Sequence, residues 1–170
     1  MEIITVKTEK IIEIAIEAGK IALGANRDKK VYTKEGRANF VTEYDTRVQE
    51  FIVDSIKKIV PDALFVCEES DSNDGYDNHS YRFIIDPIDG TTNFIRNAPE
   101  YAVCIGVMKG DDQVCGVVHC PALRITYYAE HGKIAPNLSA PALQTLHAQA
   151  WSIFRDAITD ELHEAMEPME

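Results

Sequence analysis

The sequence predicts an α+β protein, because helical and strand-like periodicity occupy separate parts of the chain. Apolar residues recur at helical spacing in two stretches before residue 60, short apolar runs bounded by turn residues follow, and helical spacing returns from Pro141. With 170 residues, 45% of them hydrophobic, the chain is long enough to bury a core. We expect a folded domain over residues 1–135 and a divergent, acidic, amphipathic tail over residues 136–170.

The first helix is predicted from about residue 7 to residue 23, where apolar residues fall on one face and Gly24 follows as a stop signal. That face comprises Ile11, Ile14, Ala15, Ala18, Ile21 and Ala22. The basic, polar stretch over residues 25–39 predicts a loop or a short hairpin.

The second helix begins at Thr42, where Thr-Glu-Tyr-Asp resembles a capping box with Asp45 in the place of the usual Glu. Its inward stripe comprises Val48, Phe51, Ile52, Ser55 and Ile59, and Pro61 ends the helix. Local evidence alone favours a structural role for Asp45, as a carboxylate stabilised by the helix dipole.

Five apolar runs predict strands, over residues 63–67, 81–85, 101–108, 114–119 and 125–129. Residues 109–112 predict a hairpin turn between the third and fourth runs. The first run ends at Glu68 and Glu69, and the second runs directly into Asp86. From Pro141 the pattern is helical again, with an apolar stripe from Leu143 to Ile158 and acidic residues at the end of the chain.

Composition excludes several function classes. Lys plus Arg is 17 and Asp plus Glu is 28, and a net charge of −11 argues against general binding of nucleic acid. No apolar run is long enough to cross a bilayer, and no signal-peptide pattern is present, so we expect a cytoplasmic protein without membrane contact. The four cysteines form no CxxC pair, which predicts reduced thiols rather than a zinc site.

A carboxylate cluster is the strongest chemical signal in the sequence. In Asp86-Pro-Ile-Asp-Gly90, proline fixes one φ and glycine permits a tight turn, so the side chains of Asp86 and Asp89 can converge. Carboxylates that close repel each other unless a cation lies between them, and oxygen-only ligands suit Mg²⁺. The carbonyl of Ile88 adds a further oxygen. The alternative is that these acids are solvated loop residues.

The identities of the residues in and around this segment are more specific evidence of function than the spacing of the acids. Glu68-Glu-Ser, Asp86-Pro-Ile-Asp-Gly-Thr-Thr-Asn-Phe94 and residues 39–45 resemble the inositol monophosphatase family of metal-dependent, lithium-sensitive phosphatases. Further matches are Lys34, residues 116–119 and residues 127–130, so the resemblance covers about residues 7–134 in matching order. It implies the N-terminal half of a layered α-β-α-β-α sandwich, with two helices on a large, mainly antiparallel sheet.

The resemblance also implies roles for individual residues. Glu68, Asp86 and the carbonyl of Ile88 hold a first Mg²⁺, and Asp86 bridges to a second ion that Asp89 also binds. Substrate-binding roles fall on Glu68, Ile88, Asp89, Gly90 and Thr91.

Phosphate and water contacts follow from the same resemblance. The N–H groups of Gly90 and Thr91 hold the phosphate, and these residues with Thr92 open a helix. Thr91 pairs with Asp45 to orient the attacking water, and Glu69 supports the site. Structural roles stay open as alternatives for Asp45 and Glu69.

The sequence departs from the family pattern in its last part. Family members carry a Trp-Asp-x-Ala-Ala-Gly motif whose Asp binds the second metal, whereas Trp151 is followed by Ser152. We therefore expect Mg²⁺-dependent hydrolysis of a small phosphate monoester, impaired by the missing carboxylate. The alternatives are a metal- and phosphate-binding domain without turnover, or a protein-interaction role for the stripe from Leu143 to Ile158.

The substrate stays open between inositol monophosphate, fructose 1,6-bisphosphate and 3′-phosphoadenosine 5′-phosphate. The motif variant with Ile88 and Asn93-Phe94 favours the inositol phosphatase branch. A homodimer is expected because family members are commonly dimers.

Overall fold

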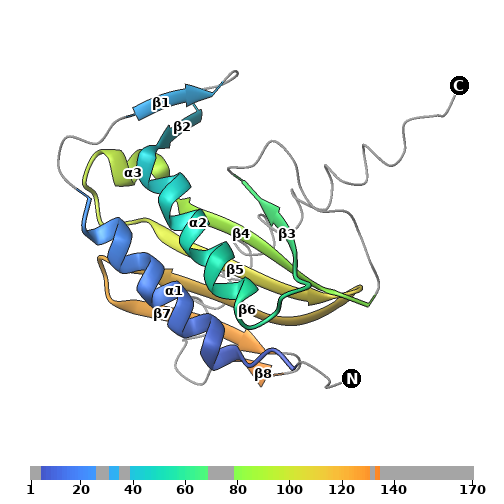
Figure 1. The fold of residues 1–170 in the computed structure, drawn as a ribbon. Coiled ribbons are helices and arrows are strands. Elements are labelled where there is room, and N and C mark those ends of the chain that lie inside the picture. Colours follow the sequence, from blue (N-terminus) through green and yellow to red (C-terminus); the bar gives the residue numbers. More distant parts are fainter. Residues whose placement is uncertain (1–4, 26–30, 35–38, 69–78, 131–132, 135–170) are drawn as a thin grey trace, which may run out of the picture. The chain divides into compact units, whose positions relative to one another are not determined.

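The computed structural model describes residues 5–25, 31–34, 39–68, 79–130 and 133–134 (Figure 1). The chain divides into two units, residues 1–134 and 135–170, and every described residue belongs to the first unit. The predicted tail over residues 136–170 and Glu69 lie outside the described residues. Among the described helices, none has both the length and the apolar character needed to cross a membrane.

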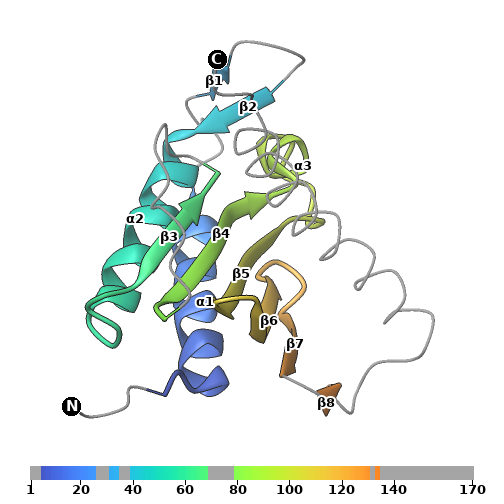
Figure 2. The ribbon, with the colours of Figure 1, turned by 90° about the vertical axis from the view of Figure 1, so that its right-hand side faces the viewer.

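A six-stranded sheet forms the centre of the described unit, and its strands follow one another in chain order (Figure 2). The strands are β3 (Leu64–Cys67), β4 (Tyr81–Asp89), β5 (Ala102–Lys109), β6 (Asp112–Cys120), β7 (Ile125–Glu130) and β8 (Lys133–Ile134). β3 pairs with β4 in parallel, and every other neighbouring pair in this sheet is antiparallel. The mainly antiparallel sheet expected from the sequence is confirmed.

Two helices cover one face of this sheet (Figure 1). Helix α1 (Thr8–Leu23) contacts β5, β6 and β7, and α2 (Glu43–Lys57) contacts α1 and β4. In α1 the expected face is buried, except that Ile14 and Ile21 are only partly buried. The stripe predicted for α2 is wrong at its end. Phe51 and Ser55 are only half-buried, and Ile59, which follows the last helical residue Lys57, is 37% exposed. Ile56 and Val60 are buried instead.

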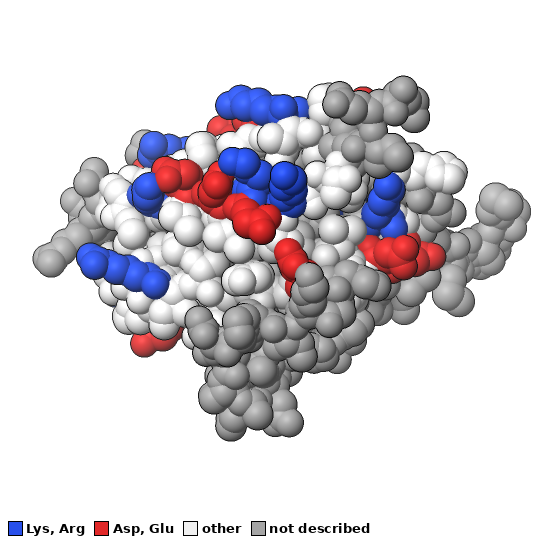
Figure 3. All heavy atoms as spheres, turned by 90° about the horizontal axis from the view of Figure 1, so that it is seen from below, with Lys and Arg blue, Asp and Glu red and all other residues white. Residues whose placement is uncertain are grey.

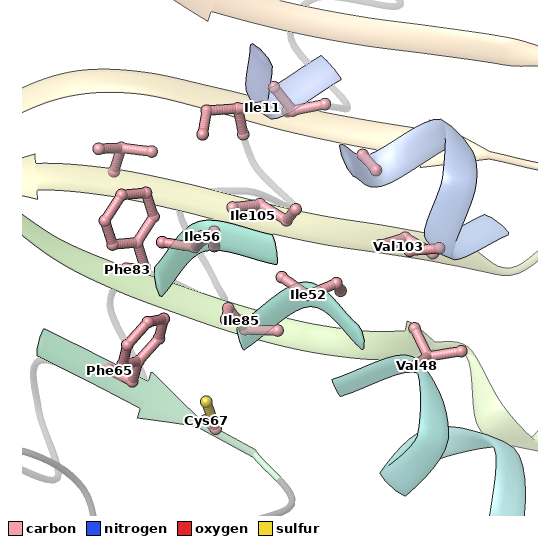
Figure 4. Packing of buried hydrophobic residues seen from close by; sticks show 14 of the residues in the cluster. Ile11, Val48, Ile52, Ile56, Phe65, Cys67, Phe83, Ile85, Val103 and Ile105 are labelled. Atoms are coloured by element: carbon pink, nitrogen blue, oxygen red, sulfur yellow. The ribbon is translucent and has the colours of Figure 1, made fainter. Parts of the chain in front are cut away.

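The core lies between the helices and the sheet (Figure 4). Ile52 of α2 faces Ile85 of β4, and Val103 and Ile105 of β5 extend the same apolar layer. Strand alternation sends every second residue toward the helices, which is why Phe83 and Ile85 both reach the core. Fully burying a side chain of this kind stabilises the fold by about 1.5–3 kcal/mol.

Three smaller elements complete the described unit. The strands β1 (Val31–Lys34) and β2 (Asn39–Thr42) form an antiparallel pair, so the hairpin predicted over residues 25–39 extends three residues further, to Thr42. Helix α3 (Thr91–Ile95) lies between β4 and β5 in the chain and contacts β2. Among the described residues all four cysteines are free thiols, as the sequence predicted.

The surface charges are mixed in sign. On the face shown in Figure 3, basic and acidic side chains are interspersed rather than gathered into a broad patch of one sign. Two exposed pairs on α1 follow this pattern, Lys10 with Glu13 at 2.7 Å and Lys20 with Glu17 at 2.5 Å. Exposed pairs of this kind add little stability, typically about 0.3–0.5 kcal/mol each.

Candidate metal and phosphate centre

The carboxylate cluster lies where β3 and β4 end. Parallel strands bring their carboxyl ends to one edge of a sheet, and Cys67 is in register with Ile85. The backbone N–H of Glu68 donates to the carbonyl of Ile85 at 3.2 Å, which places Glu68 beside Asp86. The two acids that the sequence predicted as neighbours are therefore brought together by backbone pairing.

Asp86 and Asp89 are separated by an irregularity in β4. The pairing of β4 with β5 shifts register between Asp86, opposite Cys104, and Asp89, opposite Ala102. Pro87 lies inside this shift and has no N–H to donate to the neighbouring strand. Ile88 is 1% exposed and its side chain joins the apolar core, so the turn is anchored between the two aspartates.

Gly90 makes the turn from β4 into α3. Its φ of 87° is left-handed, and a Cβ at this position would lie 3.0 Å from the carbonyl oxygen of Glu100. The N–H groups of Asn93 and Phe94 donate to the carbonyl of Gly90 at 2.8 and 3.0 Å, so a short helix begins here as predicted. The side-chain amide of Asn93 also donates to the Glu100 carbonyl at 2.7 Å, which ties α3 to the start of β5.

Aromatic packing fixes α3 against α2. The ring of Phe94 meets Tyr44 edge to face at 6.1 Å between centroids, and meets Tyr101 in the same way at 5.0 Å. Phe94 is 1% exposed, so this contact is part of the core. Because Tyr44 precedes Asp45, the packing brings Thr91 and Asp45 together.

Asp45 caps α2, as the structural alternative predicted, and it also lies beside Thr91. Its Oδ2 atom accepts hydrogen bonds from the N–H of Thr42 at 2.8 Å and from the hydroxyl of Thr42 at 2.5 Å, which completes the predicted capping box. Its Oδ1 atom lies 3.5 Å from the hydroxyl oxygen of Thr91. Asp45 is 1% exposed, so one buried carboxylate caps α2 and also reaches the predicted site.

The hydroxyl of Thr91 has two acceptors within reach. It donates to the carbonyl oxygen of Ile88 at 3.0 Å, and Asp45 Oδ1 is the more distant acceptor at 3.5 Å. A hydroxyl carries a single proton, so it satisfies one acceptor at a time. The hydroxyl of Thr91 therefore lies between two alternative acceptors, Asp45 and the Ile88 carbonyl, and this carbonyl is one of the predicted metal ligands.

The electrostatics of Asp86 are unusual for a carboxyl group. Burial, followed by the charges of Glu68 and Asp89 and a hydrogen bond with Glu68, raises its pKa from 3.8 to about 9. Its Oδ1 atom is buried and has no hydrogen-bond partner. Burial also raises the pKa of Asp89, although the backbone N–H of Gly90 partly offsets this. Asp86 is thus desolvated, and the described residues place no compensating positive charge beside it.

This environment fits a divalent cation. An orphaned buried carboxylate oxygen between two further acids is stabilised by a cation, and the donor set consists of oxygen atoms alone. Among the described residues, however, no three His, Cys, Asp or Glu side chains have the spacing of a closed metal site. The ligand set of Glu68, Asp86, Asp89 and Ile88 accordingly stays a prediction.

Thr42 and Cys104 are neighbours of the predicted site that no sequence signal assigns to it. The sequence indicates only a helix cap at Thr42, although its hydroxyl also donates to Asp45. Cys104 lies opposite Asp86 on β5, a register that no sequence signal reveals. Burial, and then the nearby carboxylates, raise the pKa of the Cys104 thiol well above its usual value, so this thiol stays protonated and is not a nucleophile.

Comparison with known proteins gives a consistent result. A sequence model described as the inositol monophosphatase family matches residues 5–152. The chain is 40% identical over 106 residues to a fructose-1,6-bisphosphatase/inositol-1-monophosphatase from Thermotoga maritima, covering 62% of this chain and 40% of that protein. It is 32% identical over 127 residues to a 3′(2′),5′-bisphosphate nucleotidase from Aggregatibacter actinomycetemcomitans, covering 73% of this chain and 47% of that protein.

Solved structures agree with the sequence comparison. An inositol monophosphatase from Thermotoga maritima superimposes with a TM-score of 0.68 at 33% identity, covering 74% of this chain and 48% of that one. The chain thus spans less than half the length of each of these three relatives.

Proposed function

The chain belongs to the inositol monophosphatase family, and on that premise we propose that it hydrolyses a small phosphate monoester with Mg²⁺ and a metal-activated water. The observation that carries the proposal is the state of Asp86, whose buried Oδ1 atom has no hydrogen-bond partner and whose pKa is raised to about 9. A carboxylate in this setting needs a cation to be ionised at neutral pH. Asp86 is also the residue that the family resemblance makes the bridging ligand.

We propose separate metal-binding and phosphate-binding roles for residues of this chain. Glu68, Asp86, Asp89 and the carbonyl of Ile88 would hold Mg²⁺, which when bound lowers the pKa of water and offsets charge on the phosphate. The N–H groups of Gly90 and Thr91 bind phosphate oxygens.

Thr91 and Asp45 orient the attacking water. The Thr91 hydroxyl accepts a hydrogen bond from the water while donating its own proton to Asp45 Oδ1. Water then attacks phosphorus in line with the leaving oxygen.

Inositol monophosphate is the substrate we propose first. The Ile88 and Asn93-Phe94 variant of the motif supports this choice. Fructose 1,6-bisphosphate and a 3′-phosphorylated nucleotide are the alternatives, since relatives are named as a fructose bisphosphatase and as a bisphosphate nucleotidase. The proposal includes a cytoplasmic location, together with inhibition by lithium and a homodimer, which both follow from the family resemblance.

A second candidate function is binding of metal and phosphate without turnover. The sequence carries no Trp-Asp-x-Ala-Ala-Gly motif, so a carboxylate that the family uses at its second metal is absent from these residues. Losing one contact to the transition state costs roughly 10²–10³ in rate in other enzymes. Under the first proposal we therefore expect slow but measurable turnover, whereas the second candidate function predicts none.

The decisive experiment measures phosphate release from inositol 1-phosphate with and without Mg²⁺, together with Mg²⁺ binding by calorimetry. We expect Asp86→Asn to lose both activity and Mg²⁺ binding. Asp112→Asn, which removes an exposed carboxylate from the start of β6, is the matched control and should change neither. Binding without release would favour the second candidate, and equal Mg²⁺ binding by Asp86→Asn and the wild type would overturn both.

A further inference from the structure

We propose that Thr42 is a positioning residue that holds Asp45 in the orientation needed to act on Thr91. The inference rests on the proposed function, in which Thr91 and Asp45 orient the attacking water. Thr42 is the last residue of β2 and the N-cap of α2, so it joins a strand to a helix at one point of the chain. At 1% exposure it is as buried as Asp45 itself.

One hydrogen bond of Thr42, the bond that its hydroxyl proton makes, exceeds what the capping box requires. Capping needs the hydroxyl oxygen to accept from a free helix N–H, and here it accepts from the N–H of Tyr44 at 3.2 Å. The hydroxyl proton is not needed for this, and it is donated to Asp45 Oδ2 at 2.5 Å. The N–H of Thr42 donates to the same oxygen at 2.8 Å.

Two donors on one oxygen determine where the other oxygen lies. With Oδ2 bound twice by Thr42, the carboxylate of Asp45 cannot rotate without breaking both bonds, and Oδ1 stays on the side of Thr91. Both residues are buried, so water does not readily replace the lost partner.

The consequence for Thr91 concerns the direction of its proton. Its hydroxyl chooses between the carbonyl of Ile88 at 3.0 Å and Asp45 Oδ1 at 3.5 Å. When the carboxylate of Asp45 is held in place, it competes with the Ile88 carbonyl for the hydrogen bond from Thr91. When the carboxylate rotates away, Thr91 donates to the Ile88 carbonyl alone. Thr42 therefore acts on Thr91 only through Asp45, which makes it a positioning residue rather than a catalytic one.

Three variants separate positioning from capping. Thr42→Ser keeps the hydroxyl, and Thr42→Val removes both the cap and the donated proton. Glu50→Gly, at an exposed position in α2, weakens the same helix by another route and serves as the matched control. We expect kcat for inositol 1-phosphate with Mg²⁺ to fall at least about tenfold in Thr42→Val, with KM changed by less than about threefold.

The control and the rescue decide the interpretation. Thr42→Ser should retain kcat within about twofold, and Glu50→Gly should lower the melting temperature but leave kcat near the wild-type value. A loss of kcat in Glu50→Gly that matches its loss of stability would show that helix stability alone explains the effect, and would overturn the proposal. Unchanged kcat in Thr42→Val would overturn it as well.

A readout independent of turnover covers the case in which the wild-type chain releases no phosphate. The unfolding constants of Thr42→Val, Thr91→Val and the double variant form a thermodynamic cycle. If Thr42 acts on Thr91 through Asp45, the two effects should deviate from additivity by at least about threefold in the unfolding constant. The corresponding cycle of Glu50→Gly with Thr91→Val should be additive. Additivity in both cycles would sink the positioning role, whereas an inactive wild type with a coupled cycle would count only against the proposed function.

Discussion

Asp45 is buried and Asp86 is half-buried with one buried oxygen, and the hydrogen bonding of these two carboxylates of the predicted site is opposite. Asp45 accepts hydrogen bonds from the N–H and the hydroxyl of Thr42, and Thr91 lies beside its other oxygen. Asp86 has an oxygen with no partner and two acids as neighbours. Among the described residues, Asp45 therefore has its hydrogen-bond donors, whereas Asp86 Oδ1 has none and is open to a cation.

The difference originates in the elements that carry the two residues. Asp45 lies in the first turn of α2, where free N–H groups and the helix dipole favour a negative charge. Asp86 lies near the end of a strand whose backbone groups already bond to β5, so the strand has few donors to offer. The helix start therefore supplies hydrogen-bond donors to the carboxylate of Asp45, whereas the strand end supplies few to Asp86.

The largest effect should come from supplying that cation. Mg²⁺ at 100 times its dissociation constant should raise the free energy of unfolding by about 2.7 kcal/mol. Its affinity should increase with pH, because Asp86 must release its proton before it binds a cation. Thermal unfolding across a Mg²⁺ titration at pH 6 and at pH 8 tests both statements. A melting temperature that does not change with Mg²⁺ would contradict the inference that Asp86, unlike Asp45, needs a cation.

Removing the charge of Asp86 should stabilise the chain when Mg²⁺ is absent. The folded pKa of about 9 lies above the unfolded value of 3.8, so the folded state binds more protons between these values. The stability that protonated Asp86 contributes is complete below about pH 3.8 and is lost as the pH rises toward about 9.

Asp86→Asn should therefore gain about 1–3 kcal/mol at pH 8 and should flatten the pH dependence of unfolding. Urea unfolding of both proteins in the presence of a chelator measures the difference. Less stability in Asp86→Asn than in the wild type would show that the carboxylate is already compensated.

The same substitution at Asp45 should have the opposite sign. An amide in Asp45→Asn weakens the charge-assisted bonds from Thr42, and the loss of such a cap costs about 1–2 kcal/mol. Urea unfolding of Asp45→Asn beside Asp86→Asn gives the comparison directly. Two shifts of the same sign would remove the distinction between the satisfied and the unsatisfied carboxylate.

The smallest effect concerns His119, a buried titratable group in contact with α1. Its ring lies so close to Gly19 that a Cβ there would fall 2.6 Å from His119 Cδ2, and its Nδ1 atom lies 2.9 Å from the Thr126 hydroxyl. Burial lowers its pKa from 6.5, so the unfolded state binds the proton more readily and stability falls as the pH drops below about 6.5.

This direction is opposite to that of Asp86. His119→Gln should reduce the acid-side loss of stability and leave the alkaline side unchanged, as measured by melting temperature between pH 5 and pH 9. If the melting temperature of His119→Gln falls at low pH as much as that of the wild type, His119 does not cause the acid-side loss of stability.

The sequence predicted the turn of the site better than its surroundings. Pro87 fixes one φ and Gly90 permits the left-handed turn, so the convergence of Asp86 and Asp89 was predicted from the five residues 86–90. The expected helix start at Thr42 was confirmed because capping chemistry is also local.

Non-local features could not be predicted. The register that sets Cys104 opposite Asp86 depends on a strand pairing that the spacing of residues does not specify. The packing of Phe94 against Tyr44, which brings Thr91 to Asp45, depends on tertiary contact. The error at Ile59 has the same origin, since periodicity gives the buried face of a helix but not where that helix stops.

The position of β3 has a consequence for local opening of the fold. In the described sheet β3 is an edge strand of four residues that pairs with β4 alone, yet it leads into Glu68. Short edge strands open at a lower free energy than central ones, and here Phe65 of β3 stacks on Phe83 of β4 with 5.9 Å between the ring centroids. A cation shared by Glu68 and Asp86 would join the edge strand to its neighbour. Amide hydrogen exchange in β3 would then slow with Mg²⁺, while exchange in the central strands β5 and β6 would hardly change.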